Sequence, residues 1–400
     1  MGSSPGSAPA TEERLLGLID PGEIVALTQT LVRATGGNPP GEEAATAAAL
    51  TQACRERGLD VEESTVAPGR PNIRALLPGG SGPGLLLLGH TDVVPVGAGW
   101  TVDPFGAEVR DGRVFGRGST DMKGGLAACV VAMSALRRAG IALSGPVELA
   151  ALVDEEATGH GIRHYVSAAD RSHFAGCIVA EPTDLQTIIA ARGDSYVEVL
   201  VRGAAAHSGR PDDGRNAIYG AAAVISDLQA WHRELAPQAH PLVGPATWSV
   251  GLVDGGLGTS TVPAECRISA DRRLLPEEEA DCVLEAVRGR IARLELHRQG
   301  LDVDISMPMS MPGFETPAEH PFVTVADRAL ADAGGPGLPL GGWTAACDGG
   351  FMARDAGVPT IVLGPGSVND QAHRADESVG VEELVVAARA YALAALRLLG

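Results

Sequence analysis

The sequence predicts an α/β protein with a doubly wound mixed sheet and a smaller inserted α+β domain. Strand-like and helix-like segments alternate through about residue 190, as they do in doubly wound sheets. The order then changes to strand, helix, strand, strand and helix, which is typical of a small ferredoxin-like domain with an open sheet. After about residue 303 the first pattern resumes. We therefore expect a discontinuous first domain at 11–190 and 304–400, with the insert at 191–303.

Composition and charge exclude several classes of partner. The chain has 400 residues, 45% of them hydrophobic, which is enough to form two buried cores. Its net charge is -19 and Lys123 is its only lysine, so we expect neither nucleic acid nor a membrane surface as a partner. Residues 1–10 are mostly small and predict a flexible tail rather than a signal peptide. Six cysteines without paired spacing favour a cytoplasmic location.

The first candidate site follows a predicted buried strand. The apolar run Leu85 to Gly89 ends at His90, and Asp92 follows two residues later. Ligands of α/β proteins bind at the carboxyl ends of strands, and a nearby aspartate can fix the orientation of a histidine ring. By itself the motif indicates a structural histidine as readily as a metal ligand.

A glycine-dense loop at 116–125 supplies the next candidate, Asp121, just before the helix predicted at 126–136. Glycines let the backbone approach a ligand closely. A helix N-cap is the alternative role of this aspartate.

Another strand, predicted at 147–153, ends in Asp154, Glu155 and Glu156. Three adjacent carboxylates repel one another, and a nearby cation would relieve that repulsion. The alternative is a solvated acidic turn. Glu181 follows another strand, at 177–180, and His373 lies in the loop after 360–363.

Together these motifs resemble the M20 metallopeptidases and amidohydrolases, which include acetylornithine deacetylase, succinyl-diaminopimelate desuccinylase, aminoacylase and glutamate carboxypeptidase. The resemblance covers nearly the whole chain from about Ile24, and the segment 363–377 is most similar to the deacetylase and desuccinylase branch. It implies one metal position at His90 and Glu181, a second at Glu156 and His373, and Asp121 as the bridging ligand. It also implies that Asp92 orients His90 and that Glu155 is the general acid/base.

The ligand set predicts two zinc ions, with cobalt or manganese as substitutes, because it combines imidazole and carboxylate without thiolate. Asp121, Glu156 and Glu181 would cancel three of the four positive charges of two divalent ions, and a bridging hydroxide would cancel the last. Glu155 is then free to take a proton from the attacking water and pass it to the leaving nitrogen. We expect hydrolysis of the amide bond of a small N-acyl amino acid.

The insert contains segments that are expected to form a lid and a homodimer interface, as in the M20 family. We predict strands at 195–202, 247–253 and 266–272, and helices at 216–231 and 276–297. His207 lies among small residues in the loop 203–211, where it is either an ordinary exposed histidine or the family's oxyanion ligand supplied to the partner subunit.

Substrate contacts are predicted at three places. Arg272 and Arg273 offer a guanidinium fork for a carboxylate, and the family pattern favours Arg272 of the two. A plain surface arginine is the alternative. Thr261 stands where many relatives have asparagine before Val-Pro, and Gly349 belongs to a glycine loop that should line the pocket.

Other functions stay open. A dipeptidase or a glutamate-type carboxypeptidase of the same fold is the main rival, although Glu181 favours a deacylase or carboxypeptidase over an aminopeptidase. An inactive metal-binding regulatory relative is a second alternative, against which Glu155 argues. A nucleotide-binding role for the loop 116–125 is disfavoured because the loop lacks a Walker lysine-serine ending.

Overall fold

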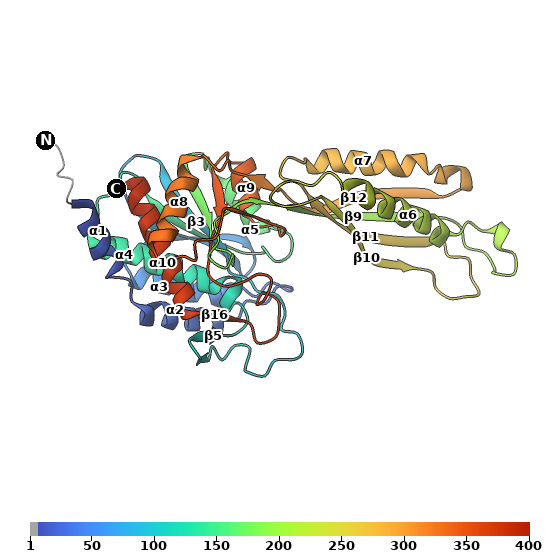
Figure 1. The fold of residues 1–400 in the computed structure, drawn as a ribbon. Helices are drawn as coiled ribbons and strands as arrows, with labels where there is room; N and C mark the ends of the chain where they lie inside the picture. Colours follow the sequence, from blue (N-terminus) through green and yellow to red (C-terminus); the bar gives the residue numbers. More distant parts are fainter. Residues whose placement is uncertain (1–6) are drawn as a thin grey trace. The chain divides into compact units, whose positions relative to one another are not determined.

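The computed structural model describes residues 7–400 and divides into two compact units (Figure 1). Unit 1 runs to Ile189 and resumes over Glu315–Gly341 and Phe351–Gly400. Unit 2 comprises Ala190–Phe314 and Gly342–Gly350. The sequence pattern did not indicate that the second of these segments joins unit 2.

The flexible tail expected at 1–10 is partly wrong. Residues 1–6 lie outside the described residues, but the remaining four belong to helix α1 (Ser7–Leu16). This helix is held because Leu15 is fully buried and α1 contacts helices α4 (Gly124–Ala139) and α10 (Val381–Leu399).

The large sheet has nine strands and confirms the predicted mixed α/β class. Its order is β1-β2-β6-β3-β7-β15-β8-β13, and β14 pairs with β8. The strands are β1 (Asp60–Ala67), β2 (Arg70–Leu77), β3 (Gly84–His90), β6 (Val147–Leu152), β7 (Phe174–Val179), β8 (Ile188–Ala191), β13 (Phe314–Glu315), β14 (Gly341–Trp343) and β15 (Thr360–Val362). Strands β6, β3, β7 and β15 are mutually parallel neighbours. Every residue of β3 and β6 is buried, which explains why β3 is apolar up to His90 and why β6 has Glu148 as its only charged residue.

The helices of unit 1 form its core with this sheet. The core helix α4 contacts β3 and β6, and it also contacts α2 (Pro21–Arg33) and α10. Helix α10 contacts α8 (Pro321–Asp332) as well. The remaining helices are α3 (Ala44–Glu56), α5 (His160–Ala168) and α9 (Gly349–Arg354). A separate three-stranded sheet, which the sequence did not predict, joins β4 (Val109–Arg110), β5 (Arg113–Phe115) and β16 (Ser378–Gly380).

Unit 2 is an antiparallel four-stranded sheet with two helices, α6 (Ala217–Leu235) and α7 (Ala280–Arg293). The strand order is β10-β11-β9-β12, formed by β9 (Gly193–Arg202), β10 (Thr247–Gly255), β11 (Glu265–Leu274) and β12 (Asp302–Met311). Alternate residues such as Val197, Val199 and Val201 form an apolar core with both helices. The predicted strand at 195–202 and helix at 276–297 correspond to β9 and α7, whereas β12 was not predicted.

Within the described residues, no single helix is both long enough and apolar enough to cross a membrane. A bent pair, Pro9–Leu16 with Pro21–Arg33, meets the length and composition criteria only when its two helices are taken together.

Candidate metal centre

Five chain segments bring the predicted metal ligands to one place in unit 1. His90 ends β3, the turn Asp154 to Glu156 follows β6, and Glu181 follows β7. Because these three strands are parallel neighbours, their carboxyl ends lie at the same edge of the sheet. Asp121 lies in the short π-helical turn η1 (Ser119–Lys123), and His373 lies in the loop before β16.

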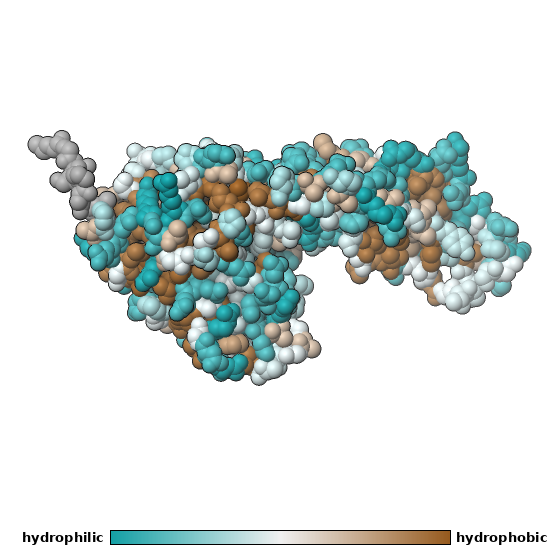
Figure 2. All heavy atoms as spheres, in the orientation of Figure 1, coloured by the Kyte–Doolittle hydropathy of each residue, from teal (hydrophilic) through white to brown (hydrophobic). Residues whose placement is uncertain are grey.

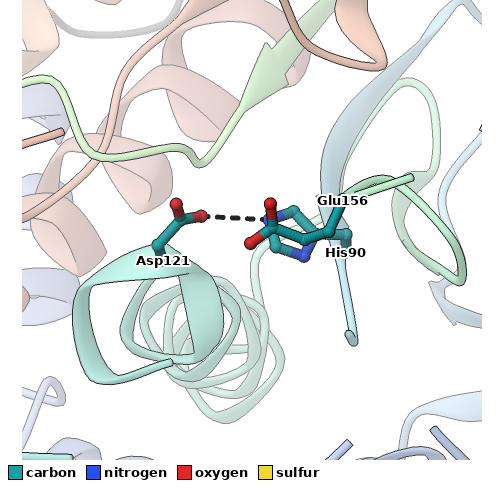
Figure 3. A group of neighbouring side chains, drawn as sticks. All are labelled: His90, Asp121 and Glu156. Carbon is teal, nitrogen blue, oxygen red and sulfur yellow. Dashed lines mark hydrogen bonds and ion pairs between the residues drawn. The ribbon is translucent and has the colours of Figure 1, made fainter. Parts of the chain in front are cut away.

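His90 lies at the buried side of this cluster. Its Nε2 atom is 3.1 Å from Asp121 Oδ1 and 3.4 Å from Glu181 Oε1. Figure 3 shows the side chains of His90, Asp121 and Glu156 converging, with a dashed line between His90 and Asp121. Both His90 and Glu181 are almost fully buried. The structure therefore brings together the three residues that the sequence predicts for the first metal position.

His373 lies at the more exposed side. Its Nε2 atom is 3.3 Å from Asp121 Oδ2 and 3.1 Å from Glu156 Oε2. The His373 side chain is 53% exposed, compared with 1% for His90. Asp121 thus presents one oxygen to each histidine, which is the arrangement required of a ligand shared by two metal positions.

Glu155 lies in the same cluster. Ligand atoms of His90, Glu155 and Glu181 are within 4.8 Å of one another, as are those of His90, Asp121 and Glu156. The structure therefore brings the predicted general base next to two of the predicted ligands of the first metal position.

The charges of this cluster fit a cationic ligand. Burial raises the pKa of Glu181 to about 7, and burial followed by the charge of Asp121 raises the pKa of Glu156. Hydrogen bonds from His373 and His90 lower the pKa of Asp121 against the opposing effect of burial. Hydrogen bonds to Asp121 and Glu156 raise the pKa of His373 to about 10.

Across residues 7–400, the ion-pair partners of Asp121, Glu156 and Glu181 are the two histidines themselves. Three buried carboxylates therefore meet no arginine or lysine. Their donor set, two imidazoles and three carboxylates, suits a divalent cation of borderline hardness such as zinc.

Asp92 lies against the His90 ring, as expected, and also makes contacts that were not expected. The Nδ1 atom of His90 is 2.9 Å from the main-chain oxygen of Asp92, and 3.6 Å from its carboxylate. The carboxylate also accepts hydrogen bonds from the main-chain N–H groups of Glu155 at 3.2 Å and Glu156 at 3.1 Å. Asp92 thus links the end of β3 to the turn that carries the general base.

Glu377 is a second buried carboxylate that shapes the site, and the sequence did not single out this role. Its Oε1 atom accepts hydrogen bonds from the main-chain N–H groups of Thr120 and Asp121, at 2.9 and 3.0 Å. Its other oxygen pairs with Arg117 at 2.5 Å. Glu377 follows His373 in the chain, so it ties the loops of two candidate ligands together.

In unit 2, the structure places His207 and Thr261 together. Both are exposed, and they form an isolated β-bridge. The Nδ1 atom of His207 accepts a hydrogen bond from the N–H of Gly209 at 3.0 Å. Gly349 is buried at the start of α9.

The predicted substrate contact at Arg272 is wrong. Arg272 is fully buried, its Nη2 atom pairs with Glu278 at 2.6 Å, and its guanidinium lies near the rings of Trp231 and Trp248. Adjacent residues of a strand face opposite sides, and Arg272 is on the side that the helices cover. Arg273 lies on the other side, where it pairs with Asp271 at 2.9 Å and Asp194 at 3.3 Å.

Comparisons with known proteins match this architecture. The model of peptidase family M20/M25/M40 matches residues 86–397. The chain is 32% identical to acetylornithine deacetylase of Vibrio vulnificus over 80% of this chain and 82% of that protein. It is also 32% identical to succinyl-diaminopimelate desuccinylase of Gluconacetobacter diazotrophicus, over 96% of this chain and 100% of that one.

Two solved structures illustrate the similarity of fold. One is an M20 metallo-carboxypeptidase of Sulfolobus solfataricus, with a TM-score of 0.78 and 18% identity, covering 94% of this chain and 98% of that one. The other is a dinuclear metal-binding M20 peptidase of Bacillus subtilis, with a TM-score of 0.71 and 17% identity, covering 98% and 99%.

Proposed function

This chain belongs to peptidase family M20/M25/M40 and is a metal-dependent amidohydrolase, and we propose that it removes the acyl group from a small N-acyl amino acid. The observation that carries this proposal is the shared position of Asp121 between His90 and His373, with Glu155 in the same cluster. Two relatives are named as a deacetylase and a desuccinylase, which supports a deacylase activity rather than a peptidase activity. Glu181 argues only against an aminopeptidase, because it favours a deacylase or a carboxypeptidase equally.

We propose that His90 and Glu181 hold one zinc ion, that His373 and Glu156 hold another, and that Asp121 is shared by both. Cobalt or manganese would suit the same ligands. A bound ion of this kind lowers the pKa of water from 15.7 toward about 7 and so supplies a nucleophile near neutral pH. The chain itself must then move the protons and hold the substrate.

Glu155 is the residue proposed to move the proton. Its carboxylate accepts a proton from the attacking water and returns it to the nitrogen that leaves, so the amine departs neutral. Asp92 holds the Glu155 main chain through the N–H of that residue. This contact limits the directions in which the carboxylate can point.

Residues of unit 2 are proposed to complete the site in a homodimer. His207, beside Thr261, would donate a hydrogen bond to the oxygen that gains charge during the reaction. Arg273 replaces Arg272 as the proposed partner of a substrate carboxylate, because its side chain is partly exposed.

The surface of unit 2 supports assembly into a dimer. Strand β10 is an edge strand, and Leu252 and Val253 on it are 70% and 54% exposed. Tyr219 on α6 is 74% exposed. Figure 2 shows hydrophobic atoms gathered over the edge of unit 2 where Figure 1 places β10. We also propose a cytoplasmic location, because five of the six cysteines are buried and their spacing in the sequence is not that of a paired set.

Amine release from N-acetyl, N-succinyl and N-formyl amino acids and from dipeptides tests this function, measured together with bound metal. We expect release from N-acyl amino acids by the wild-type protein. Glu155→Gln keeps the volume but cannot accept a proton, so its turnover should fall by about 100-fold or more with near-normal metal content.

Hydrolysis of dipeptides alone would instead identify a peptidase. Bound metal without amine release from any substrate would identify a regulatory relative. Full activity of Glu155→Gln would remove Glu155 from the mechanism.

A further inference from the structure

We propose that Asn38 is a positioning residue for the active site, and that it fixes Glu155 and Glu156 through Asp92 and Asp154. The inference rests on the proposed function, because it assigns a role in the same reaction. Asn38 lies before the segment matched by the family model, which begins at residue 86.

The side chain of Asn38 joins two buried carboxylates. Its Nδ2 atom is 2.8 Å from Asp92 Oδ2 and 3.1 Å from Asp154 Oδ1, so one amide group donates a hydrogen bond to each. Asn38 is 3% exposed, Asp92 is 0% exposed and Asp154 is 3% exposed. Two negative charges this close in a buried place repel each other unless a donor lies between them. The neutral amide supplies two N–H donors without adding a charge.

Both carboxylates control the turn after β6. Asp92 accepts hydrogen bonds from the N–H groups of Glu155 and Glu156. Asp154 precedes them with a positive φ of 69°, and its side chain accepts hydrogen bonds from Thr158 and from the N–H of His160. Asn38 therefore sets the spacing between the end of β3 and the turn that carries the base.

An ion pair with Arg70 also holds Asp154. Arg70 donates to Asp154 Oδ1 at 2.8 Å and also forms an ion pair with Glu43, which is 0% exposed. The main-chain N–H of Asn38 donates to the carbonyl of Val93 at 2.9 Å, just after β3. This hydrogen bond fixes the main chain of Asn38 next to the end of β3. The side-chain amide therefore has a fixed position, from which it holds the turn after β6 in place.

The test compares Asn38→Asp with Asn72→Asp. Asn72 is also buried, and its side chain contacts the main chain of Val153 and Gly161 rather than a carboxylate. Asn38→Asp keeps the shape but places a third carboxylate oxygen against two others. We expect kcat to fall about 10- to 100-fold with KM changed less than about 3-fold. Asn72→Asp should lower the unfolding midpoint without this loss of kcat.

Amide hydrogen exchange in the metal-free protein gives a readout that does not depend on activity. In Asn38→Asp, the N–H groups of Glu155 and Glu156 should exchange at least about 10-fold faster than in the wild type, because their acceptor Asp92 is displaced. Asn72→Asp should leave their exchange unchanged. Asn38→Ser, which keeps a single donor, should show a smaller effect of the same kind and carries the test if Asn38→Asp does not fold.

Equal kcat losses in Asn38→Asp and Asn72→Asp would overturn the inference, as would unchanged exchange at Glu155 and Glu156. A wild-type protein that releases no amine from any substrate would overturn the proposed function instead. In that case faster exchange in Asn38→Asp would still establish that Asn38 fixes the turn.

Discussion

The two units differ in how they hold their candidate functional side chains. In unit 1 the cluster around Asp121 is surrounded by carboxylates that fix the main chain, as Asp92 fixes Glu155 and Glu377 fixes Asp121. In unit 2, His207 is exposed and its ring accepts a hydrogen bond from a residue two positions away. The cluster of unit 1 is positioned by residues of its own chain, so it needs no second chain to complete it. An exposed loop becomes part of a site only when another surface covers it, so changes in unit 2 should act through assembly.

The largest effect is expected from Asp121→Ala in unit 1. Loss of a carboxylate shared between His90 and His373 should empty or disorder both metal positions and abolish amine release. Metal content per chain, measured after dialysis, checks this. Asp111→Ala is a suitable control, because the Asp111 side chain is 88% exposed. Two ions bound at normal affinity in Asp121→Ala would show that Asp121 is not shared.

An intermediate effect is expected from His207 in unit 2, and it should depend on the partner subunit. His207→Ala should lower turnover by about 100-fold or more, which corresponds to about 3 to 4 kcal/mol of lost oxyanion stabilisation. A mixed dimer of one His207→Ala chain and one Glu155→Gln chain then contains one site with both residues intact. It should regain roughly half of the wild-type activity if His207 acts on the partner's site.

Differently tagged chains, co-expressed and purified as the mixed dimer, make this measurement possible. If His207 serves its own chain, every site in that dimer lacks one group. Activity would then stay at the level of the two parent proteins. This result would show that His207 does not act through assembly of the dimer.

The smallest effect is expected from Asp194, a buried aspartate of unit 2. Asp92 in unit 1 accepts several hydrogen bonds, and Asp194 is less well hydrogen-bonded. Burial raises the pKa of Asp194 from 3.8 to about 7, although Arg273 opposes this. One of its oxygens has no hydrogen-bond partner among the described residues. Between these two pKa values the folded protein keeps a proton that the unfolded chain has lost, so stability falls as the pH rises from about 4 to about 7.

Asp194→Asn removes this titration. The variant should raise the unfolding midpoint relative to the wild type at pH 8 by more than it does at pH 4, which thermal unfolding at both pH values measures. An equal change at both pH values would mean that Asp194 does not titrate in this window.

The mixed α/β fold and the gathering of candidate ligands could be predicted because both depend on local patterns. Apolar runs followed by His90, Glu156 or Glu181 indicate strand ends, and parallel strands bring such ends together. Their roles as ligands stay predictions. The roles of Asn38 and Glu377 were missed because their hydrogen-bond partners lie far away in the sequence. No local sequence pattern marks a buried amide or carboxylate that makes such distant contacts.

The error at Arg272 has a different cause. Adjacent strand residues face opposite sides, so a one-residue choice between Arg272 and Arg273 decides whether a guanidinium is buried or available. The sequence shows both arginines but does not show which side the helices cover. The small sheet of β4, β5 and β16 was missed because its strands are short and two of them are far from the third in the chain.

Lys123, the only lysine of the chain, is fully buried, and its ammonium donates to the main-chain carbonyl of Thr35. The folded protein therefore offers no side-chain amine to acylating dyes or crosslinkers. An endoproteinase that cuts after lysine can attack only when the start of α4 opens, and a complete digest yields a single cut. That cut lies two residues from Asp121. The cleavage rate with and without added zinc therefore measures, without a label, how much zinc binding stabilises this segment against local unfolding.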